Sequence, residues 1–88
     1  MQLSGKNIIV TGAATGIGRA IAEIFAQNGA ALVLADVNDT DLCATASKIV
    51  ADGSACSSRH ADVSCASEVQ ALVRYAEDKL GGVDVVVN

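Results

Sequence analysis

Three glycines lie close together between an apolar run and a helical pattern, in the stretch Thr11-Gly12-Ala13-Ala14-Thr15-Gly16-Ile17-Gly18. Gly12 would let the chain leave a strand through a tight turn, Gly16 would let a bound anion approach the backbone, and Gly18 would let the next helix pack closely on the strand. The free N–H groups of the helix that begins near Ile17, with the Thr15 hydroxyl, would then face a phosphate. We therefore expect a diphosphate-binding turn. A structural turn that binds nothing is the alternative.

An acidic residue follows at the distance that such a turn requires. Asp36 ends the next apolar run, 18 positions after Gly18, where its carboxylate would accept hydrogen bonds from ribose hydroxyls. It would repel a 2′-phosphate by about 4 kcal/mol at 4 Å, and neither Val37 nor Thr15 offers a compensating charge. This pattern predicts NAD rather than NADP. The alternative, a carboxylate that only caps the following helix, is compatible with the same position. No Gly-Lys-Ser/Thr follows the turn, so a P-loop nucleotidase is disfavoured.

The elements that must position these residues alternate along the chain. Apolar runs predict strands at 7–11, 31–35 and 83–88, and a weaker strand is predicted at about 55–60. Helical periodicity predicts helices at about 17–28, 39–51 and from Ser64 to Gly81. Asn38 or Asp39 would cap the second helix and Ser64 the third. The inner faces of the helices are predicted from apolar spacing: Ile17, Ile21, Ile24 and Phe25; Leu42, Ala46, Ile49 and Val50; Val69, Leu72, Val73, Ala76 and Leu80.

This β-α-β-α-β-α-β order predicts an α/β fold with a doubly wound parallel sheet, because parallel neighbours need crossover connections and the helices supply them. Crossovers of this kind are right-handed. In a doubly wound sheet the strands would lie in the order 3-2-1-4, with the first two helices on one face and the third on the other. The third strand is polar and should form an edge.

The glycine stretch resembles the classical short-chain dehydrogenase/reductase family, whose first turn reads T-G-x-x-x-G-x-G, as Thr11, Gly12, Gly16 and Gly18 do here. Asp36 stands where that family selects NAD. The resemblance covers the whole chain. It implies a Rossmann-type fold in which residues 1–88 are the N-terminal part of a single dinucleotide-binding domain. It also implies hydride transfer between nicotinamide and a small-molecule carbonyl or alcohol, by a protein that forms a homo-oligomer when intact.

The resemblance extends to two further positions. Asp62 and Val63 match an Asp-Val pair whose side chain and backbone contact adenine; a helix-preceding aspartate with no ligand is the alternative. Val87-Asn88 resembles the start of the family's N-N-A-G segment, so Asn88 is expected near the cofactor ribose. The expected cofactor-binding set is therefore Gly12, Thr15, Gly16, Ile17, Gly18, Asp36, Asp62, Val63 and Asn88.

The family's catalytic Ser and Tyr-x-x-x-Lys lie well beyond the fourth strand, so no residue of this chain is assigned a catalytic role. Tyr75 and Lys79 have the Tyr-x-x-x-Lys spacing, but they fall on the third helix, which should lie on the sheet face away from the nicotinamide. A non-catalytic dinucleotide-binding or sensor module, or a structural protein, remains an alternative. An isolated 88-residue product, with a V-D-V-V-V edge, is expected to be marginally stable and to self-associate.

Composition narrows the class of protein. The formal net charge of −4 and the near absence of aromatic residues, only Phe25 and Tyr75, argue against a nucleic-acid surface. No apolar stretch is long enough for a signal peptide or a membrane span, so a cytoplasmic protein is expected. The three cysteines form no C-x-x-C pair and are interpreted as small apolar residues, with no metal site.

Overall fold

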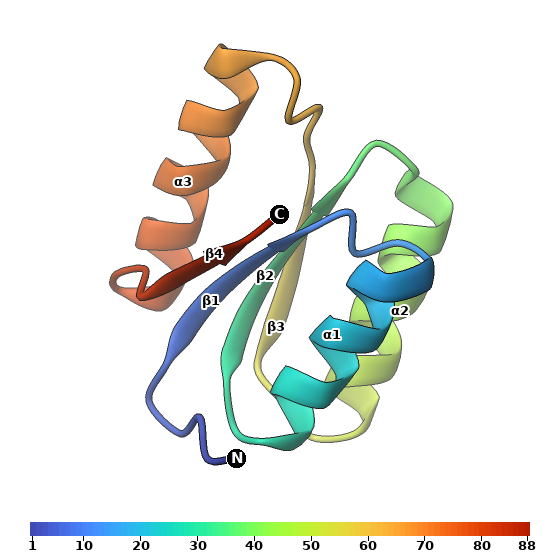
Figure 1. Ribbon diagram of the computed structural model, residues 1–88, viewed down its shortest axis with the longest axis vertical. Helices are drawn as coiled ribbons and strands as arrows, with labels where there is room; N and C mark the ends of the chain where they lie inside the picture. The colour runs from blue at the N-terminus through green and yellow to red at the C-terminus, as the bar shows by residue number, and fades with distance from the viewer.

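The computed structural model describes all 88 residues, and its seven elements follow the predicted order. The strands are β1 (Asn7–Thr11), β2 (Ala31–Asp36), β3 (Cys56–His60) and β4 (Val85–Val87), and the helices are α1 (Gly16–Gln27), α2 (Asp39–Ala51) and α3 (Ala66–Leu80). All neighbouring strands pair in parallel, in the order β3-β2-β1-β4 (Figure 1). The predicted doubly wound sheet and its strand order are confirmed.

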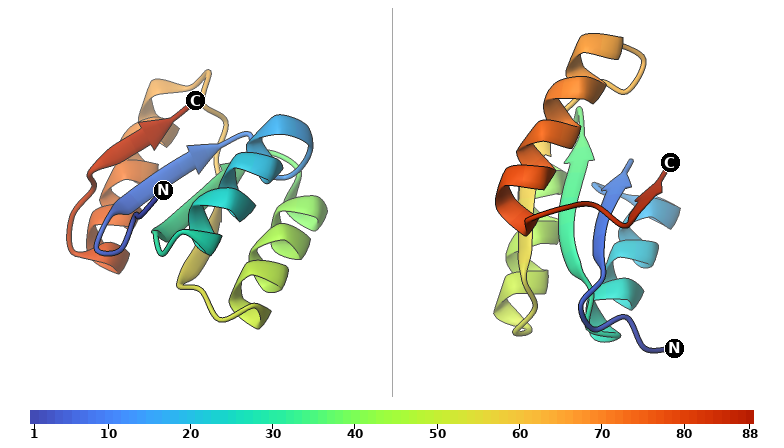
Figure 2. Two further views of the ribbon diagram at one scale, coloured as in Figure 1. Left: turned by 60° about the horizontal axis from the view of Figure 1, so that its bottom comes forward. Right: turned by 90° about the vertical axis from the view of Figure 1, so that its left-hand side faces the viewer.

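The two central strands are apolar on both faces because helices cover both faces of the sheet. Successive side chains of a strand point to opposite faces, so Ile8 and Val10 pack toward α1 and α2, while Ile9 packs toward α3. Helices α1 and α2 lie together on one face and α3 lies on the other, as predicted (Figure 2). Strand β3 is the outer strand beyond β2, as its polarity predicts.

Ile21 and Phe25 pack against the core as predicted, but the other two residues of the predicted inner face of helix α1 do not. Its buried residues are Ala22 and Ala26, whereas Ile17 is 80% exposed and Ile24 is 48% exposed. The prediction was wrong for both isoleucines because α1 approaches the backbone too closely for large side chains. A Cβ on Gly18 would come within 2.6 Å of the Gly12 carbonyl carbon.

Helix α2 has the predicted bounds, and Asn38 rather than Asp39 is its N-cap. Leu42, Ala46 and Ile49 are buried as predicted, but Val50 is exposed and Thr45 is fully buried in its place. Thr45 lies nearer the middle of the inner face than Val50.

Helix α3 begins one position later than its predicted cap implies. Cys65 is the N-cap residue, and the Ser64 hydroxyl donates instead to the Asp62 carboxylate. Leu72 and Ala76 are its buried residues, and Gly81 ends it in the left-handed conformation, with φ of +84°.

Strand β4 is shorter than the predicted run of 83–88 and completes the far side of β1. Ile8 is in register with Val85, and the Asp84 carboxylate accepts from the Asn7 N–H at 2.8 Å. The Asn7 side-chain amide donates to the Leu80 carbonyl at 3.1 Å. These contacts join the beginning of the described chain to its end.

Candidate functional site

The glycine turn leaves β1 at the carboxyl edge of the sheet and leads directly into α1 (Figure 1). Gly12 and Gly16 both have φ of +63°, a region that other residues rarely adopt. A Cβ built on either glycine would meet nothing within 4 Å, so backbone conformation rather than crowding requires glycine there. Gly18 has the opposite requirement, because it packs against the carbonyl groups of Gly12 and Thr11.

The first turn of α1 leaves a group of unpaired donors. Thr15 is the N-cap in an extended conformation, but its side chain makes no capping hydrogen bond, and the first turn contains no acidic residue. Arg19 is the first residue of the helix whose N–H pairs, with the Thr15 carbonyl at 3.4 Å. The N–H groups of residues 15–18 have no partner within the chain. Together with the helix dipole they make this end of α1 suited to an anion.

Asp36 lies beside this turn at the end of β2. Its Oδ2 accepts from the Ala14 N–H at 3.0 Å and its Oδ1 accepts from the Asn38 N–H at 3.1 Å. Partial burial alone would raise the pKa of Asp36, but the hydrogen bonds from the backbone of Asn38, Ala14 and Val37 outweigh it and hold the pKa below its ordinary value. The carboxylate is therefore ionised at neutral pH and has further lone pairs free to accept.

A hollow of about 190 Å³ brings several predicted residues together at the carboxyl ends of β1, β2 and β3. It is lined by Gly12, Asp36, Val37, Ala61, Asp62 and Val63. The Asp62 Oδ1 accepts from the hydroxyl of Ser64 at 2.6 Å and from its N–H at 2.9 Å, and these bonds lower the pKa of Asp62. Two ionised carboxylates thus flank the hollow, with apolar walls between them.

Asn88 belongs to a neighbouring, mostly apolar hollow of about 390 Å³, which Thr11 and Val63 also line. The Thr11 hydroxyl lies 3.1 Å from the Val87 carbonyl and 3.3 Å from Asn88 Oδ1, so it ties the end of β4 to the end of β1. Val63 lines both hollows. The predicted Thr15, Gly16, Ile17 and Gly18 line neither hollow and form the adjacent helix start.

The sequence did not lead us to the residues that support the glycine turn on its buried side. Ala13 and Ala14 are buried, and the hydroxyl of buried Thr45 lies 3.3 Å from the Ala14 carbonyl. The available signal was a threonine in the middle of the apolar face of α2, between Leu42 and Ile49.

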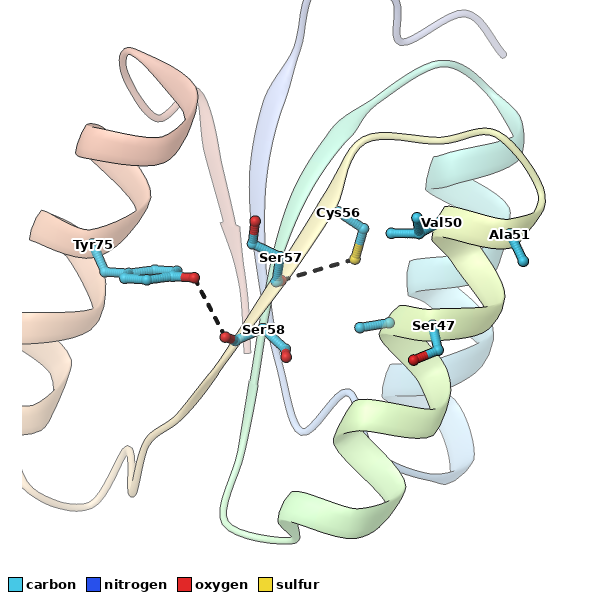
Figure 3. Close-up of a pocket in the computed structure, with 8 residues that line it drawn as sticks. Ser47, Val50, Ala51, Cys56, Ser57, Ser58 and Tyr75 are labelled. Atoms are coloured by element: carbon cyan, nitrogen blue, oxygen red, sulfur yellow. Dashed lines mark hydrogen bonds between the residues drawn. The ribbon is translucent and has the colours of Figure 1, made fainter.

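Tyr75 reaches the outer strand β3, at the other end of the strand order from β4, and Lys79 lies near the Tyr75 ring. The Tyr75 hydroxyl is directed at the Ser58 carbonyl, at 3.5 Å (Figure 3). The Arg59 guanidinium and the Lys79 ammonium lie 5.4 and 5.6 Å from the centre of the Tyr75 ring. The largest hollow of the chain, about 520 Å³, also lies here and is lined by residues of α2 and β3 besides Tyr75. It shares no lining residue with the glycine turn.

The three cysteines are free thiols, and burial raises the pKa of Cys56 to about 11. None of the three helices is long and apolar enough to cross a membrane.

Residues 6–88 match the family model described as short chain dehydrogenase. The chain is 38% identical over 87 residues to the uncharacterized oxidoreductase YxbG of Bacillus subtilis (strain 168), covering 99% of this chain and 32% of that protein.

Two solved structures have the same fold over this region. One is a short-chain dehydrogenase/reductase from Burkholderia phymatum in complex with NAD, with a TM-score of 0.94 and 38% identity, covering 98% of this chain and 31% of that one. The other is a 7α-hydroxysteroid dehydrogenase complexed with NADH and 7-oxo glycochenodeoxycholic acid, with a TM-score of 0.97 and 38% identity, covering 99% and 34%. The chain thus spans about a third of the length of these relatives.

Proposed function

This chain belongs to the short-chain dehydrogenase family, and from that membership and the geometry of its glycine turn we propose that the whole protein is an NAD-dependent oxidoreductase. Its reaction is hydride transfer between nicotinamide and a small-molecule carbonyl–alcohol pair. Residues 1–88 supply the N-terminal, cofactor-binding part of a single Rossmann domain. The observation that carries the proposal is the unpaired, uncapped start of α1 beside an ionised Asp36.

The diphosphate of the cofactor binds at the first turn of α1. The free N–H groups of Thr15, Gly16, Ile17 and Gly18 donate to its oxygens, and the positive end of the helix dipole adds about 0.3–1 kcal/mol per charge. The open space at Gly16 admits the phosphate to the backbone. Exposed Ile17 gives the bound molecule an apolar contact.

The adenosine part binds in the 190 Å³ hollow between Asp36 and Asp62. Asp36 accepts from the 2′- and 3′-hydroxyls of the ribose, and its charge disfavours a 2′-phosphate by about 4 kcal/mol at close range. Asp62 accepts from the adenine amino group, and Val63 covers the base. Asn88, which directly follows β4 and meets Thr11 at the end of β1, lines the second ribose.

NAD supplies the hydride acceptor or donor for the reaction, and the residues of this chain bind and orient it. The relatives that carry NAD or NADH in their structures support this choice of cofactor. We further propose a cytoplasmic homo-oligomer that binds no nucleic acid and no membrane.

Isothermal titration of the whole protein with NAD and with NADP tests the proposal. The wild-type protein should bind NAD more tightly than NADP, and Asp36→Ala should weaken NAD binding by about tenfold while reducing the preference over NADP. Asp39→Ala is the matched control, because Asp39 is an exposed neighbour that pairs with His60.

An unchanged cofactor preference in Asp36→Ala would remove the assignment of NAD selection to this carboxylate. Failure of the wild-type protein to bind either dinucleotide would overturn the proposed function. NAD binding without NADH formation, across a panel of alcohols, would favour the non-catalytic alternative.

A further inference from the structure

Ala14 is, with Ala13, one of the two buried residues in the middle of the glycine turn. It lies between Gly12 and Gly16 and is only 1% exposed, so its N–H and carbonyl both need partners inside the protein. Glycines with positive φ on either side make the turn easily deformed. The partners of Ala14 therefore fix the direction in which the next four N–H groups point.

All of these partners come from the neighbouring β2–α2 unit. The Ala14 N–H donates to Asp36 at 3.0 Å, and the Ala13 N–H donates to the Ala35 carbonyl at 3.2 Å. The Ala14 carbonyl has one donor within 3.5 Å, the hydroxyl of Thr45 at 3.3 Å.

Thr45 is fully buried, on the inner face of α2. Its single hydroxyl hydrogen is shared between the Ala14 carbonyl and the Asp41 carbonyl, which lies one turn earlier in α2 at 3.1 Å. The Asp41 carbonyl alone would satisfy the hydroxyl. The Ala14 carbonyl, however, would then be buried without a donor, which folded proteins avoid.

We propose that Thr45 is a positioning residue for the diphosphate-binding turn. It makes no contact with the cofactor and acts through Ala14, whose fixed carbonyl orients the N–H groups of residues 15–18. The inference rests on the proposed function, because it concerns how the same NAD site is held. It assigns a part in cofactor binding to a side chain on a different βα unit from the glycine turn.

The test compares three variants of the whole protein. Thr45→Val keeps the buried shape and removes the hydroxyl, whereas Thr45→Ser keeps the hydroxyl and removes a methyl group. Ile49→Val is the matched control, since it removes one methyl group from the same buried face and Ile49 makes no hydrogen bond to the turn. Each is measured by NAD titration and by hydrogen exchange at the Ala14 amide.

Thr45→Val should weaken NAD binding by about fivefold, raise KM for NAD with little change in kcat, and speed exchange at Ala14. Thr45→Ser and Ile49→Val should bind NAD as the wild type does. A merely structural threonine would give the same NAD affinity in Thr45→Val as in Ile49→Val at equal loss of stability.

Two negative outcomes distinguish a failure of this inference from a failure of the proposed function. If the wild type binds NAD and Thr45→Val binds it equally well, the inference is overturned and the proposed function stands. If the wild type binds no NAD, the proposed function fails and the inference fails with it.

Discussion

Helices α1 and α2 cover the same face of the sheet, yet their first turns are built in opposite ways. At α2, the Asn38 side chain accepts from the Asp41 N–H at 3.1 Å and donates to the Asp41 carboxylate at 2.8 Å. Asp39 and Asp41 add negative charge to that turn. At α1, the Thr15 side chain caps nothing, and no acid lies in the first turn.

At the start of α2, a side chain of the protein itself pairs with an N–H group of the first turn. At the start of α1, the N–H groups of the first turn stay unpaired and are open to a ligand. Uncapped N–H groups lower the stability of a helix, because each lacks the hydrogen bond that a cap supplies. The first turn of α2 shows that a side-chain N-cap is present elsewhere in this same fold. The open first turn of α1, which begins at a glycine that only backbone geometry requires, is therefore consistent with a bound anion as the missing partner.

The largest expected effect comes from adding a side chain at the point where α1 lies closest to the glycine turn. Gly18→Ala puts a Cβ against the carbonyl groups of Gly12 and Thr11, so α1 must move away from the turn. We expect the free energy of unfolding to fall by about 3 kcal/mol in urea denaturation, with loss of NAD binding. Gly53→Ala, at a positive φ with open space, is the control and should cost about 1 kcal/mol. Equal losses in the two variants would show that α1 can retreat without strain.

A smaller effect is expected from giving α1 the kind of cap that α2 has. Thr15→Asp supplies a side-chain acceptor and a negative charge at the N-cap, which should raise the stability of the ligand-free protein by up to about 1 kcal/mol. The same carboxylate repels a diphosphate, so NAD affinity should fall by about tenfold or more in titration calorimetry. Thr15→Asn, a neutral cap, should weaken NAD less. Tight NAD binding by Thr15→Asp would place the diphosphate elsewhere.

The smallest effect is expected from removing the N-cap side chain of α2. Asn38→Ala removes the acceptor for the Asp41 N–H and should cost about 1 kcal/mol in thermal unfolding. NAD affinity should stay within about twofold of the wild type, because α2 only supports the site. Asn38→Ser restores an acceptor and should recover most of the stability. A large loss of NAD affinity in Asn38→Ala would mean that the two helix starts are coupled.

The order of elements and the bounds of β1 and α2 could be predicted because local signals determine them. Apolar runs mark β1, β2 and β4, and Asn38 and Gly53 bracket α2. The sheet topology could be predicted because alternating strands and helices with right-handed crossovers are typical of a doubly wound sheet. The exposed face of α1 could not be predicted by counting large apolar residues. The side of α1 that approaches the sheet most closely carries small residues: Ala22 and Ala26 are buried, and Gly18 lies against the carbonyl groups of the turn.

The predicted cofactor residues gather at one edge of the sheet because parallel strands place all their carboxyl ends there. Gly12 and Asp36, expected from their spacing, and Asp62 and Val63, expected from the family resemblance, line one hollow. Thr45 escaped prediction because a polar residue within a helix is usually read as solvent-facing, and only the tertiary position of the Ala14 carbonyl gives its hydroxyl a second partner.

The late pairing of β4 has a consequence for folding during synthesis. Contacts such as Asn7 with Asp84 join residues 77 positions apart, and at about 5–20 residues per second the ribosome delivers the second of these several seconds after the first. Strands β1, β2 and β3, with α1 and α2, emerge earlier and already contain every partner of Ala14. All residues that hold the glycine turn are therefore synthesised before the strand that completes the sheet.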